Sequence, residues 1–505
     1  MAKITLFGFM GAGKTSVGRE LARCLGIPFF DSDNLIEEKY GNISRIFEKK
    51  GEAFFRKAEE KTVTEILRKK GDFVLSLGGG AALSEKIRKT AITESIPIYL
   101  KCGVKTAFKR VEGSGRPLAK NFETFEKLFS ERKELYESLP FFADTERKNT
   151  EEIASEIENF LSPEHFSKPH KAEISVISIS ETKKRFKGFY ITDKNVFKLY
   201  RPLFSGRKGV SIPPGENSKT MRTVLSIYEK LLSYGITRND FITYAGGGVV
   251  GDIAGFVSAT LLRGVPLVAI PTTLLSMTDS AIGGKNGVNL PQGKNLIGTF
   301  YFPEYTLINP IFLNTLPASE IKNGSGEIFK YAVLSENGLF EILEKAEGDV
   351  FKSLVSKEII AKSVKEKIKF IEEDPFDRKG IRAFLNLGHT VGHTVEKLSS
   401  FSVKHGEAVA FGTIVSAFYS LKNGFIKKRD YNRIIALYKK MGFSPPGSAF
   451  SYEDVLNAMM FDKKREGGTI FWIVPVKYNK CVSVRTDIKD IAKAYEEVAN
   501  ENTRN

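Results

Sequence analysis

Three of the five histidines in this 505-residue chain, His389, His393 and His405, lie close together in the sequence. In the stretch LNLGHTVGHTVE, the i, i+4 spacing of His389 and His393 would put both imidazoles on one face of a helix. Such a pair can bind a metal ion, and neutral imidazoles suit zinc. The spacing favours His389 and His393 as ligands, with one further ligand from elsewhere in the chain. The alternative, in which the histidines cap helices or are satisfied in a core, is less favoured for a cluster than for a single histidine.

A glycine-rich loop near the start of the chain has the chemistry of a phosphate site. GFMGAGKTS matches the pattern GxxxxGK[ST], follows the apolar stretch ITLFG and precedes a helical segment. Glycines let backbone N–H groups surround phosphate oxygens, Lys14 can reach the outer phosphates, and the Thr15 hydroxyl can hold Mg²⁺. We therefore predict ATP or GTP binding rather than a simple glycine turn. The residues expected to contact the nucleotide are Gly11, Ala12, Gly13, Lys14, Thr15 and Ser16.

Polar residues that could serve this phosphate site follow at intervals. Asp31 and Asp33 come after an apolar pair where a second strand should end, and carboxylates at that end of a strand face the ligand crevice. The other candidates are Arg56, Gly78, Gly79, Gly80, Arg116 and Arg132. Taken singly, each arginine is typical of a solvated surface charge and the glycines of a turn.

A second glycine motif, formed by Gly246, Gly248 and Gly251, has the GxGxxG spacing of a dinucleotide loop and follows a predicted strand. No acidic residue follows about twenty positions later to bind a ribose, so the motif alone is weak evidence. Glycines that pack a helix against a strand would give the same spacing. Asp193, which ends the predicted strand FYITD, could bind the ribose hydroxyls instead.

The candidate residues lie at the ends of predicted strands in an α/β chain. Residues 1–161 alternate strands with amphipathic helices, the pattern of a domain with a parallel sheet. Prolines, serines and histidines interrupt the periodicity at residues 162–172, where we expect a linker. Residues 173–310 again alternate strands and helices, and residues 311–495 are mainly helical. The predicted fold class is therefore α/β: a P-loop domain, then an α/β part followed by a mainly helical part.

Composition narrows the possible partners and compartment. The net charge of +16 favours anions, either nucleic acid or small phosphorylated and carboxylated substrates. The cysteines, Cys24, Cys102 and Cys481, lie far apart without CxxC spacing, which suits a reducing cytosol. The first residues do not match a signal peptide, and Asp252 interrupts the most apolar long stretch, residues 245–262. We expect a cytoplasmic protein that does not enter a membrane.

In this order along the chain, the P-loop and its polar companions resemble shikimate kinase over residues 1 to about 160. The resemblance implies transfer of the ATP γ-phosphoryl group, with Mg²⁺, to the 3-hydroxyl of shikimate. It implies that Asp33 binds the acceptor hydroxyls and acts as the base, while Arg56 and Arg132 hold the shikimate carboxylate. Lys14 and Arg116 would be catalytic at the phosphates, with Arg116 in a lid over ATP. Backbone contacts to shikimate would come from Gly78, Gly79 and Gly80.

Residues 172 to about 490 resemble 3-dehydroquinate synthase. The resemblance rests on PPGENSKT, GGGVVGDIAGFVSATLLRG, PTTLLSMTDSAIGGKNGVN, GKNLIGTF, GEIFKYAVL, GIRAFLNLGHTVGHTVE and HGEAVAFG. It implies an NAD- and metal-dependent conversion of the seven-carbon phosphate ester DAHP to 3-dehydroquinate and phosphate. It also changes the expected ligands to Glu327, His389 and His405, which would hold Zn²⁺ or Co²⁺. His393 would then be a nearby substrate-binding or proton-relay group.

The second resemblance also implies a substrate site and a cofactor site. The substrate carries a phosphate and a carboxylate, which accounts for a cluster of cations. The implied substrate-binding residues are Arg263, Lys285, Lys294, Asn295, Lys330, Lys367, Arg382, Asn386, His393 and Lys463, with Lys285, His393 and Asp279 as catalytic residues. The implied NAD-binding residues are Asp193, Asn195, Glu216, Lys219, Gly247, Gly248, Val249, Asp252, Thr272, Thr273 and Lys294. Asn286 stands where the family usually has threonine, a departure that concerns local packing.

Together the resemblances imply two shikimate-pathway activities on one chain, with shikimate, DAHP, ATP and NAD as small-molecule partners and a homodimer through the synthase half. Neither nucleic acid nor a membrane is an expected partner. One alternative is a nucleic-acid-binding P-loop ATPase, which the basic charge suggests, but the sequence contains no recognisable basic and aromatic binding module. A second alternative is an inactive first half that only stabilises the rest of the chain.

Overall fold

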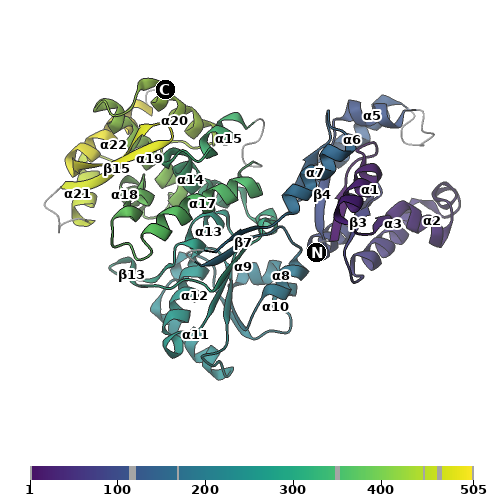
Figure 1. Ribbon diagram of the computed structural model, residues 1–505, viewed down its shortest axis with the longest axis horizontal. Coiled ribbons are helices and arrows are strands. Elements are labelled where there is room, and N and C mark those ends of the chain that lie inside the picture. Colours follow the sequence, from purple (N-terminus) through teal and green to yellow (C-terminus); the bar gives the residue numbers. More distant parts are fainter. Residues whose placement is uncertain are drawn as a thin grey trace. The chain divides into compact units, whose positions relative to one another are not determined.

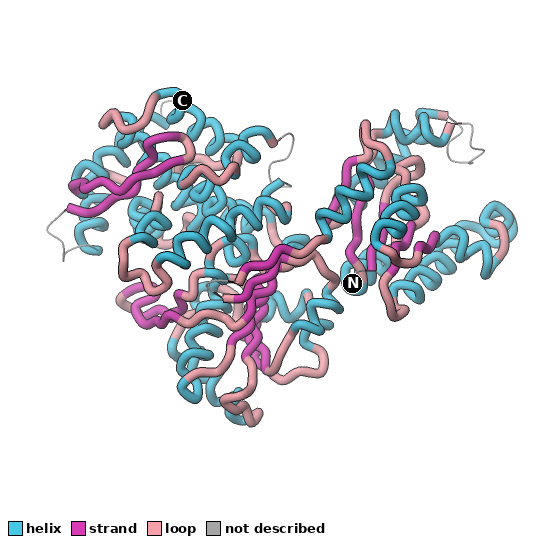
Figure 2. The backbone as a smooth tube through the Cα atoms, in the orientation of Figure 1, coloured by secondary structure: helices cyan, strands magenta, loops and turns pink. Residues whose placement is uncertain are grey.

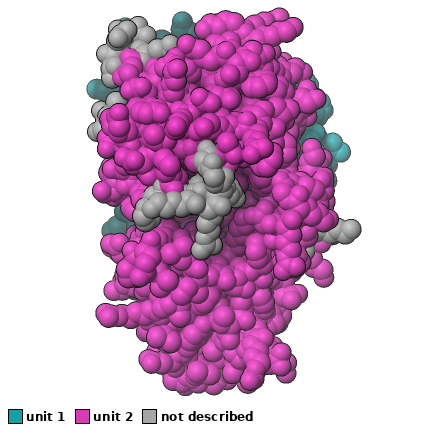
Figure 3. Space-filling view, turned by 90° about the vertical axis from the view of Figure 1, so that its left-hand side faces the viewer, with its two compact units in different colours: residues 1–163, 175–186, 199–206 teal, residues 164–174, 187–198, 207–505 magenta. Residues whose placement is uncertain are grey.

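The computed structural model describes residues 3–112, 121–167, 170–346, 353–446, 450–462 and 469–502. The chain divides into two compact units (Figure 3). Unit 1 comprises Met1–Pro163, Ser175–Phe186 and Leu199–Gly206, and unit 2 comprises Glu164–Ile174, Lys187–Lys198 and Arg207–Asn505. Each unit has its own parallel sheet, so each can build a ligand site at the ends of its strands.

The strands of unit 1 are β1 (Lys3–Phe7), β2 (Phe29–Asp31), β3 (Phe73–Ser76), β4 (Ile96–Lys101) and β5 (Phe141–Asp144) (Figure 2). They form a parallel sheet in the order β2-β3-β1-β4-β5. Apolar side chains such as Ile4, Leu6 and Val74 are fully buried on its faces. Because β1 lies between β3 and β4, the loop after β1 leaves the sheet at a topological switch point, where ligands bind in this architecture.

The helices of unit 1 are α1 (Lys14–Leu25), α2 (Ser32–Tyr40), α3 (Ile43–Leu67), α4 (Glu85–Glu94), α5 (Val104–Val111), α6 (Phe122–Glu137), α7 (Thr150–Leu161), α8 (Ile179–Arg185) and α10 (Arg201–Phe204) (Figure 1). α1 and α7 pack side by side. α3 has a kink at Gly51, whose φ is 77°. α8 and α10 follow the predicted linker in sequence but belong to unit 1, where α8 packs against α4 and Ser180 donates a hydrogen bond to Glu94.

The main sheet of unit 2 has seven strands: β6 (Glu164–Phe166), β7 (Lys171–Ile174), β8 (Phe189–Asp193), β9 (Gly209–Ile212), β10 (Ile242–Gly246), β11 (Leu267–Pro271) and β14 (Tyr305–Ile308). Their order is β6-β7-β14-β11-β10-β8-β9, and only the β6–β7 pair is antiparallel. The predicted linker, residues 162–172, therefore contains β6 and the first residues of β7. The prediction of two α/β parts with parallel strands is confirmed.

Four helices and a hairpin accompany this sheet: α9 (Lys194–Leu199), α11 (Met221–Ser233), α12 (Gly248–Thr260), α13 (Leu274–Thr278), and the strands β12 (Lys285–Leu290) and β13 (Gly293–Phe300). Ile227 and Leu231 of α11 share a buried core with Ile253 and Val257 of α12. The buried apolar side chains on α11 and α12 explain why these two helices pack in the core of unit 2.

The remainder of unit 2 contains α14 (Ala318–Leu334), α15 (Leu339–Lys345), α17 (Lys357–Glu373), α18 (His389–Leu398), α19 (His405–Lys422), α20 (Lys428–Lys440), α21 (Tyr452–Asp462), α22 (Ile488–Asn502) and the hairpin β15 (Thr469–Lys477) with β16 (Lys480–Asp487). α19 is buried along most of its length and packs against α14, α18, α20 and α22. The predicted mainly helical character is confirmed. Across the described ranges, every helix is too short or too polar to cross a membrane.

Candidate active sites

The predicted phosphate loop joins the end of β1 to the start of α1, at the switch point of the unit 1 sheet. Gly11 and Gly13 have φ values of 82° and 88°, which favour glycine. A Cβ atom on Gly11 would lie 2.2 Å from the carbonyl oxygen of Ala107, so a larger residue would not fit. The Lys14 ammonium folds over the loop and donates to the carbonyl oxygens of Gly8 and Phe9, at 2.8 and 3.0 Å.

Oxygen ligands lie directly beside this loop. The Thr15 hydroxyl donates to Asp31 Oδ2 at 2.9 Å, while Asp31 Oδ1 accepts from the backbone N–H of Asp33 at 3.0 Å. Asp31 thereby caps the N-terminus of α2 and fixes the backbone of Asp33 in the first turn of that helix. Ala12 is buried within the loop, and Ser16 is exposed in the first turn of α1. Hydroxyl and carboxylate oxygens are ligands that Mg²⁺ accepts.

The predicted acceptor residues meet around the loop that follows β3. A Cβ atom on Gly78 would lie 2.6 Å from Asp33 Oδ1, and one on Gly80 would lie 2.2 Å from Arg56 Nη1. Arg132 donates from Nη1 to the carbonyl oxygen of Gly79 at 3.1 Å. The structure thus brings Asp33, Arg56 and Arg132 together around the three glycines, whereas Arg116 lies outside the described residues.

Sequence reasoning missed a buried carboxylate beside these residues. Glu59 lies three residues after Arg56 on α3, and its Oε2 accepts from Arg56 Nη1 at 2.8 Å. Burial raises the pKa of Glu59 to about 7, although the Arg56 guanidinium opposes the rise. Tyr136 was also missed; its hydroxyl donates to the carbonyl oxygen of Gly79. The i, i+3 spacing from Arg56 was the available signal for Glu59.

In unit 2, a carboxylate and two imidazoles converge from three helices. His405 Nε2 lies 3.1 Å and His389 Nε2 lies 3.4 Å from Glu327 Oε1, and one ligand atom of each residue lies within 4.8 Å of the others. Glu327 is fully buried. Burial alone would raise the pKa of Glu327, but Lys330 and the two histidines hold it well below its usual value. The three side chains are those that the resemblance implied as metal ligands.

His393 lies beside this set rather than within it. Its ring centroid is 5.3 Å from that of His389 and 5.9 Å from that of His405. A second possible ligand set in the described chain consists of His393, Glu396 and His405. Burial would lower the pKa of His405, but hydrogen bonds with Glu327 and Glu396 raise it to about 10. The geometry gives His389 a direct partner in Glu327, which the spacing argument could not supply.

Cationic side chains surround Asp279 next to the metal-ligand set. Lys367 Nζ lies 2.9 Å from Asp279 Oδ1 and donates to its carbonyl oxygen at 2.6 Å. Lys330, which is 1% exposed, pairs with Glu327 and lies 3.9 Å from Asp279 Oδ1. Arg382 donates to the carbonyl oxygen of Gly283 at 3.1 Å. Burial lowers the pKa of Lys367, although Asp279 opposes the change.

The other implied substrate residues are less tightly gathered. Lys285 pairs with Asp377 at 2.6 Å. Asn295 has a φ of 56°, and its N–H donates to Asn289 at 3.0 Å. The remaining residues are Arg263, which is exposed after α12, Asn386, which ends the short helical turn Ile381–Asn386, and Lys463, which lies outside the described residues.

Several of the implied NAD residues lie at the ends of β8, β10 and β11. Gly247 and Gly248 start α12, with Val249 in its first turn, and the N–H of Thr272 donates to the carbonyl oxygen of Gly246 at 3.0 Å. Thr273 caps α13. Asp193 caps the next helix by accepting from the N–H of Asn195 at 2.8 Å. The remaining implied contacts form pairs: Lys219 with Asp252, and Glu216 with Asn289 at 2.7 Å.

A large cavity of about 890 Å³ opens between the β12–β13 hairpin with the start of α11 and the segment that contains His405. Glu216 and Lys294 line it, together with Glu396, Phe401 and His405. Its size is sufficient for a small phosphorylated substrate. The cavity connects residues from the α/β part with residues from the helical part of the same unit.

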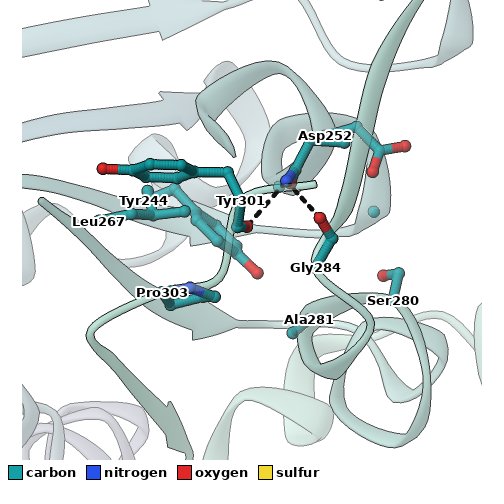
Figure 4. A pocket seen from close by; sticks show the side chains of 11 residues that line it. Tyr244, Asp252, Leu267, Ser280, Ala281, Gly284, Tyr301 and Pro303 are labelled. Carbon is teal, nitrogen blue, oxygen red and sulfur yellow. Dashed lines mark hydrogen bonds between the residues drawn. The ribbon is translucent and has the colours of Figure 1, made fainter. Parts of the chain in front are cut away.

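A second cavity, of about 10 Å³, lies behind the dinucleotide loop beside Asp252 (Figure 4). Asn286, which departs from the family, donates from its side-chain amide to the carbonyl oxygens of Gly284 and Tyr301, both at 2.9 Å. A Cβ atom on Gly255 would lie only 1.9 Å from Asn286 Oδ1, so this glycine makes room for the amide. Asn286 in place of threonine therefore affects how the two ends of the β12–β13 hairpin are held together.

Comparison with known proteins assigns the first part of the chain to one family and the rest to another. The shikimate kinase family model matches residues 10–162, the 3-dehydroquinate synthase N-terminal model residues 209–323, and the 3-dehydroquinate synthase C-terminal model residues 324–465. A bifunctional shikimate kinase/3-dehydroquinate synthase from Thermotoga maritima (strain ATCC 43589 / DSM 3109 / JCM 10099 / NBRC 100826 / MSB8) is 32% identical over 92% of this chain and 93% of its own. The chain belongs to the bifunctional shikimate kinase/3-dehydroquinate synthase family.

Further relatives match the synthase half alone. A 3-dehydroquinate synthase from Pyrococcus abyssi (strain GE5 / Orsay) is 42% identical over 54% of this chain and 79% of its own. The solved structure of ValA (2-epi-5-epi-valiolone synthase) from Streptomyces hygroscopicus subsp. jinggangensis 5008, with NAD⁺ and Zn²⁺ bound, is 23% identical. It covers 66% of this chain and 98% of that chain, with a TM-score of 0.61, which shows the shared fold. Hereafter the kinase half means residues 1–161 and the synthase half means residues 173–495.

Proposed function

We propose that the kinase half phosphorylates the 3-hydroxyl of shikimate with the γ-phosphoryl group of ATP. The observation that supports this most strongly is the closeness of two groups of residues: the phosphate loop with Thr15 and Asp31, and the side chains of Asp33 and Arg56 beside Gly78 and Gly80. A phosphoryl group on the loop and a hydroxyl beside Asp33 would be neighbours. Phosphoryl transfer depends mainly on this kind of positioning and charge stabilisation.

Each group in the kinase half then has a role. Lys14 stabilises the charge on the transferred phosphoryl group, and Asp33 binds the acceptor hydroxyl and accepts its proton. Arg56 and Arg132 hold the shikimate carboxylate, aided by N–H groups of Gly78, Gly79 and Gly80. Thr15 would hold Mg²⁺, which neutralises phosphate charge when bound, and Asp31 would orient the Thr15 hydroxyl through their hydrogen bond. Arg116 is proposed as a lid residue from the resemblance alone.

We propose that the synthase half converts DAHP to 3-dehydroquinate and phosphate. The convergence of Glu327, His389 and His405 supports this proposal, because one carboxylate oxygen and two imidazole nitrogens are donors that Zn²⁺ and Co²⁺ accept. Residues Asp193, Lys219 and Asp252, with the glycines that start α12, would hold NAD. When bound, the metal supplies Lewis acidity and NAD supplies reversible hydride acceptance.

The cations of the synthase half would hold the two anionic groups of the substrate. Lys330, Lys367 and Arg382 lie around Asp279, and Lys294 lines the large cavity. Asp279 offsets part of their positive charge, which lowers the cost of keeping these cations buried before substrate binds. His393, beside the ligand set, is proposed to bind substrate and relay protons.

The assay of both reactions on one preparation tests these proposals. The wild-type chain should phosphorylate shikimate with ATP and should release phosphate from DAHP with NAD and zinc. Lys14→Met should abolish the first reaction and leave the second. A wild-type chain that binds DNA tightly but turns over neither substrate would refute both proposals. We also propose that the chain is cytosolic, which its free cysteines support.

We propose in addition that it forms a homodimer through the synthase half, which the resemblance supports. Light scattering of the purified chain tests the dimer.

A further inference from the structure

Glu396 is a nearly buried carboxylate that none of the assigned roles uses. It lies seven residues after His389 on α18, so two helical turns bring it to the same face as that histidine. Its side chain is 9% exposed. A carboxylate in such a position needs partners that compensate for the loss of water, and Glu396 has two of them.

The first partner is His405. Glu396 Oε2 lies 3.1 Å from His405 Nδ1, and the other ring nitrogen, Nε2, lies 3.1 Å from Glu327 Oε1. The imidazole is therefore held between two carboxylates. A carboxylate at Nδ1 retains the proton there, so the lone pair of Nε2 is directed toward the proposed metal position.

The second partner is Lys294. Glu396 Oε1 lies 3.7 Å from Lys294 Nζ, which also lies 3.8 Å from the ring centroid of Phe401. Phe401 has a φ of 64°, and its N–H donates to the carbonyl oxygen of Glu396 at 2.7 Å. These side chains and His405 line the large cavity. The ammonium group is thus held at the cavity wall by a carboxylate and an aromatic face.

We propose that Glu396 is a positioning residue that orients the metal ligand His405 with one oxygen and Lys294, a proposed substrate-binding cation, with the other. The proposal rests on the proposed metal site of the synthase half. It differs from a ligand role for Glu396, which the His393, Glu396 and His405 set would require. A positioning carboxylate strengthens metal binding without being essential to it.

Zinc affinity, measured by competition with a chromophoric chelator on the full chain, tests this role independently of turnover. Glu396→Ala should weaken zinc binding by about 10- to 100-fold, and Glu396→Gln, which keeps a hydrogen-bond acceptor, should weaken it less. Glu407→Gln is the matched control, because Glu407 lies on α19 two residues from His405 and pairs with Lys322 instead. A wild-type midpoint of urea unfolding, followed by the fluorescence of Trp472 in the synthase half, verifies that this half is folded in each variant.

The outcomes separate the two proposals. A wild-type chain without zinc affinity would refute the metal site itself. Wild-type affinity in Glu396→Ala would refute the positioning role alone, and total loss of zinc in both Glu396 variants would show that Glu396 is a ligand. Lys294→Met should leave zinc affinity unchanged and raise the KM for DAHP. With zinc saturating, this KM effect should be smaller in the Glu396→Ala background; additive effects would refute the link to Lys294.

Discussion

Glu59 should make the stability of the kinase half depend on pH. Its side chain is 2% exposed, and burial raises its pKa from 4.5 to about 7 against the opposing effect of Arg56. The folded chain therefore binds this proton more tightly than the unfolded chain does. The resulting stabilisation is complete below pH 4.5 and is lost as the pH rises through about 7. At about 1.36 kcal/mol per pKa unit, the difference corresponds to roughly 3 kcal/mol.

Glu59→Gln keeps the shape of the protonated side chain and cannot ionise. Relative to the wild type, its free energy of unfolding should increase by about 3 kcal/mol between pH 4.5 and pH 8. Glu60→Gln is the matched control, since hydrogen bonds from Ser84 and Lys86 lower the pKa of this partly exposed neighbour. A lowered pKa gives a stabilisation that is already complete above pH 4.5, so this variant should show no comparable trend.

Pulse proteolysis in urea at a series of pH values provides the assay. Fragments from the kinase half, identified by mass spectrometry, report the unfolding of that half separately from the rest of the chain. A difference between Glu59→Gln and wild type that stays constant across this pH range would refute the reasoning. An equal trend in Glu60→Gln would do the same, because it would show that burial of Glu59 is not the cause.

Two further substitutions test the geometry of each half. Gly80→Ala should raise the KM for shikimate about 10-fold or more. The new Cβ would lie 2.2 Å from Arg56 Nη1, so the guanidinium must move and its charge-assisted hydrogen bonds to the shikimate carboxylate weaken. An unchanged KM would contradict the predicted carboxylate site. Asp252→Asn should lower the free energy of unfolding of the synthase half by about 3 kcal/mol, because it leaves the nearly buried ammonium of Lys219 unpaired. Urea unfolding, followed by the fluorescence of Trp472, the single tryptophan, measures this change. A midpoint at the wild-type value would show that the Lys219–Asp252 ion pair does not stabilise the synthase half.

Local patterns predicted much of the fold. The phosphate loop could be found because its glycines, Lys14 and Thr15 are adjacent in sequence, and the apolar strand before it fixes its place at a sheet end. The alternation of strands and helices predicted two α/β parts, although the assignment of α8 to unit 1 depends on its packing against α4. That packing is a long-range contact, which local periodicity does not report.

The candidate sites show the same division between local and long-range information. Helical spacing related His389 to His393, but the direct partner of His389 is Glu327, sixty-two positions earlier on another helix. From the sequence, only the resemblance to 3-dehydroquinate synthase identified Glu327 as a ligand. Neither residue spacing nor the resemblance identified Glu59 and Glu396, since their importance lies in burial and in their contacts with Arg56 and His405. Burial of a single acidic residue cannot be predicted from its own position in the sequence.

The claim that one chain carries two independent reaction centres is tested most directly with Glu327→Gln. The purified variant should contain no bound zinc and release no phosphate from DAHP, while it phosphorylates shikimate at the wild-type rate. Metal analysis and the two assays on the same preparation provide the result. Stoichiometric zinc in the variant, or a parallel loss of both activities, would contradict the account.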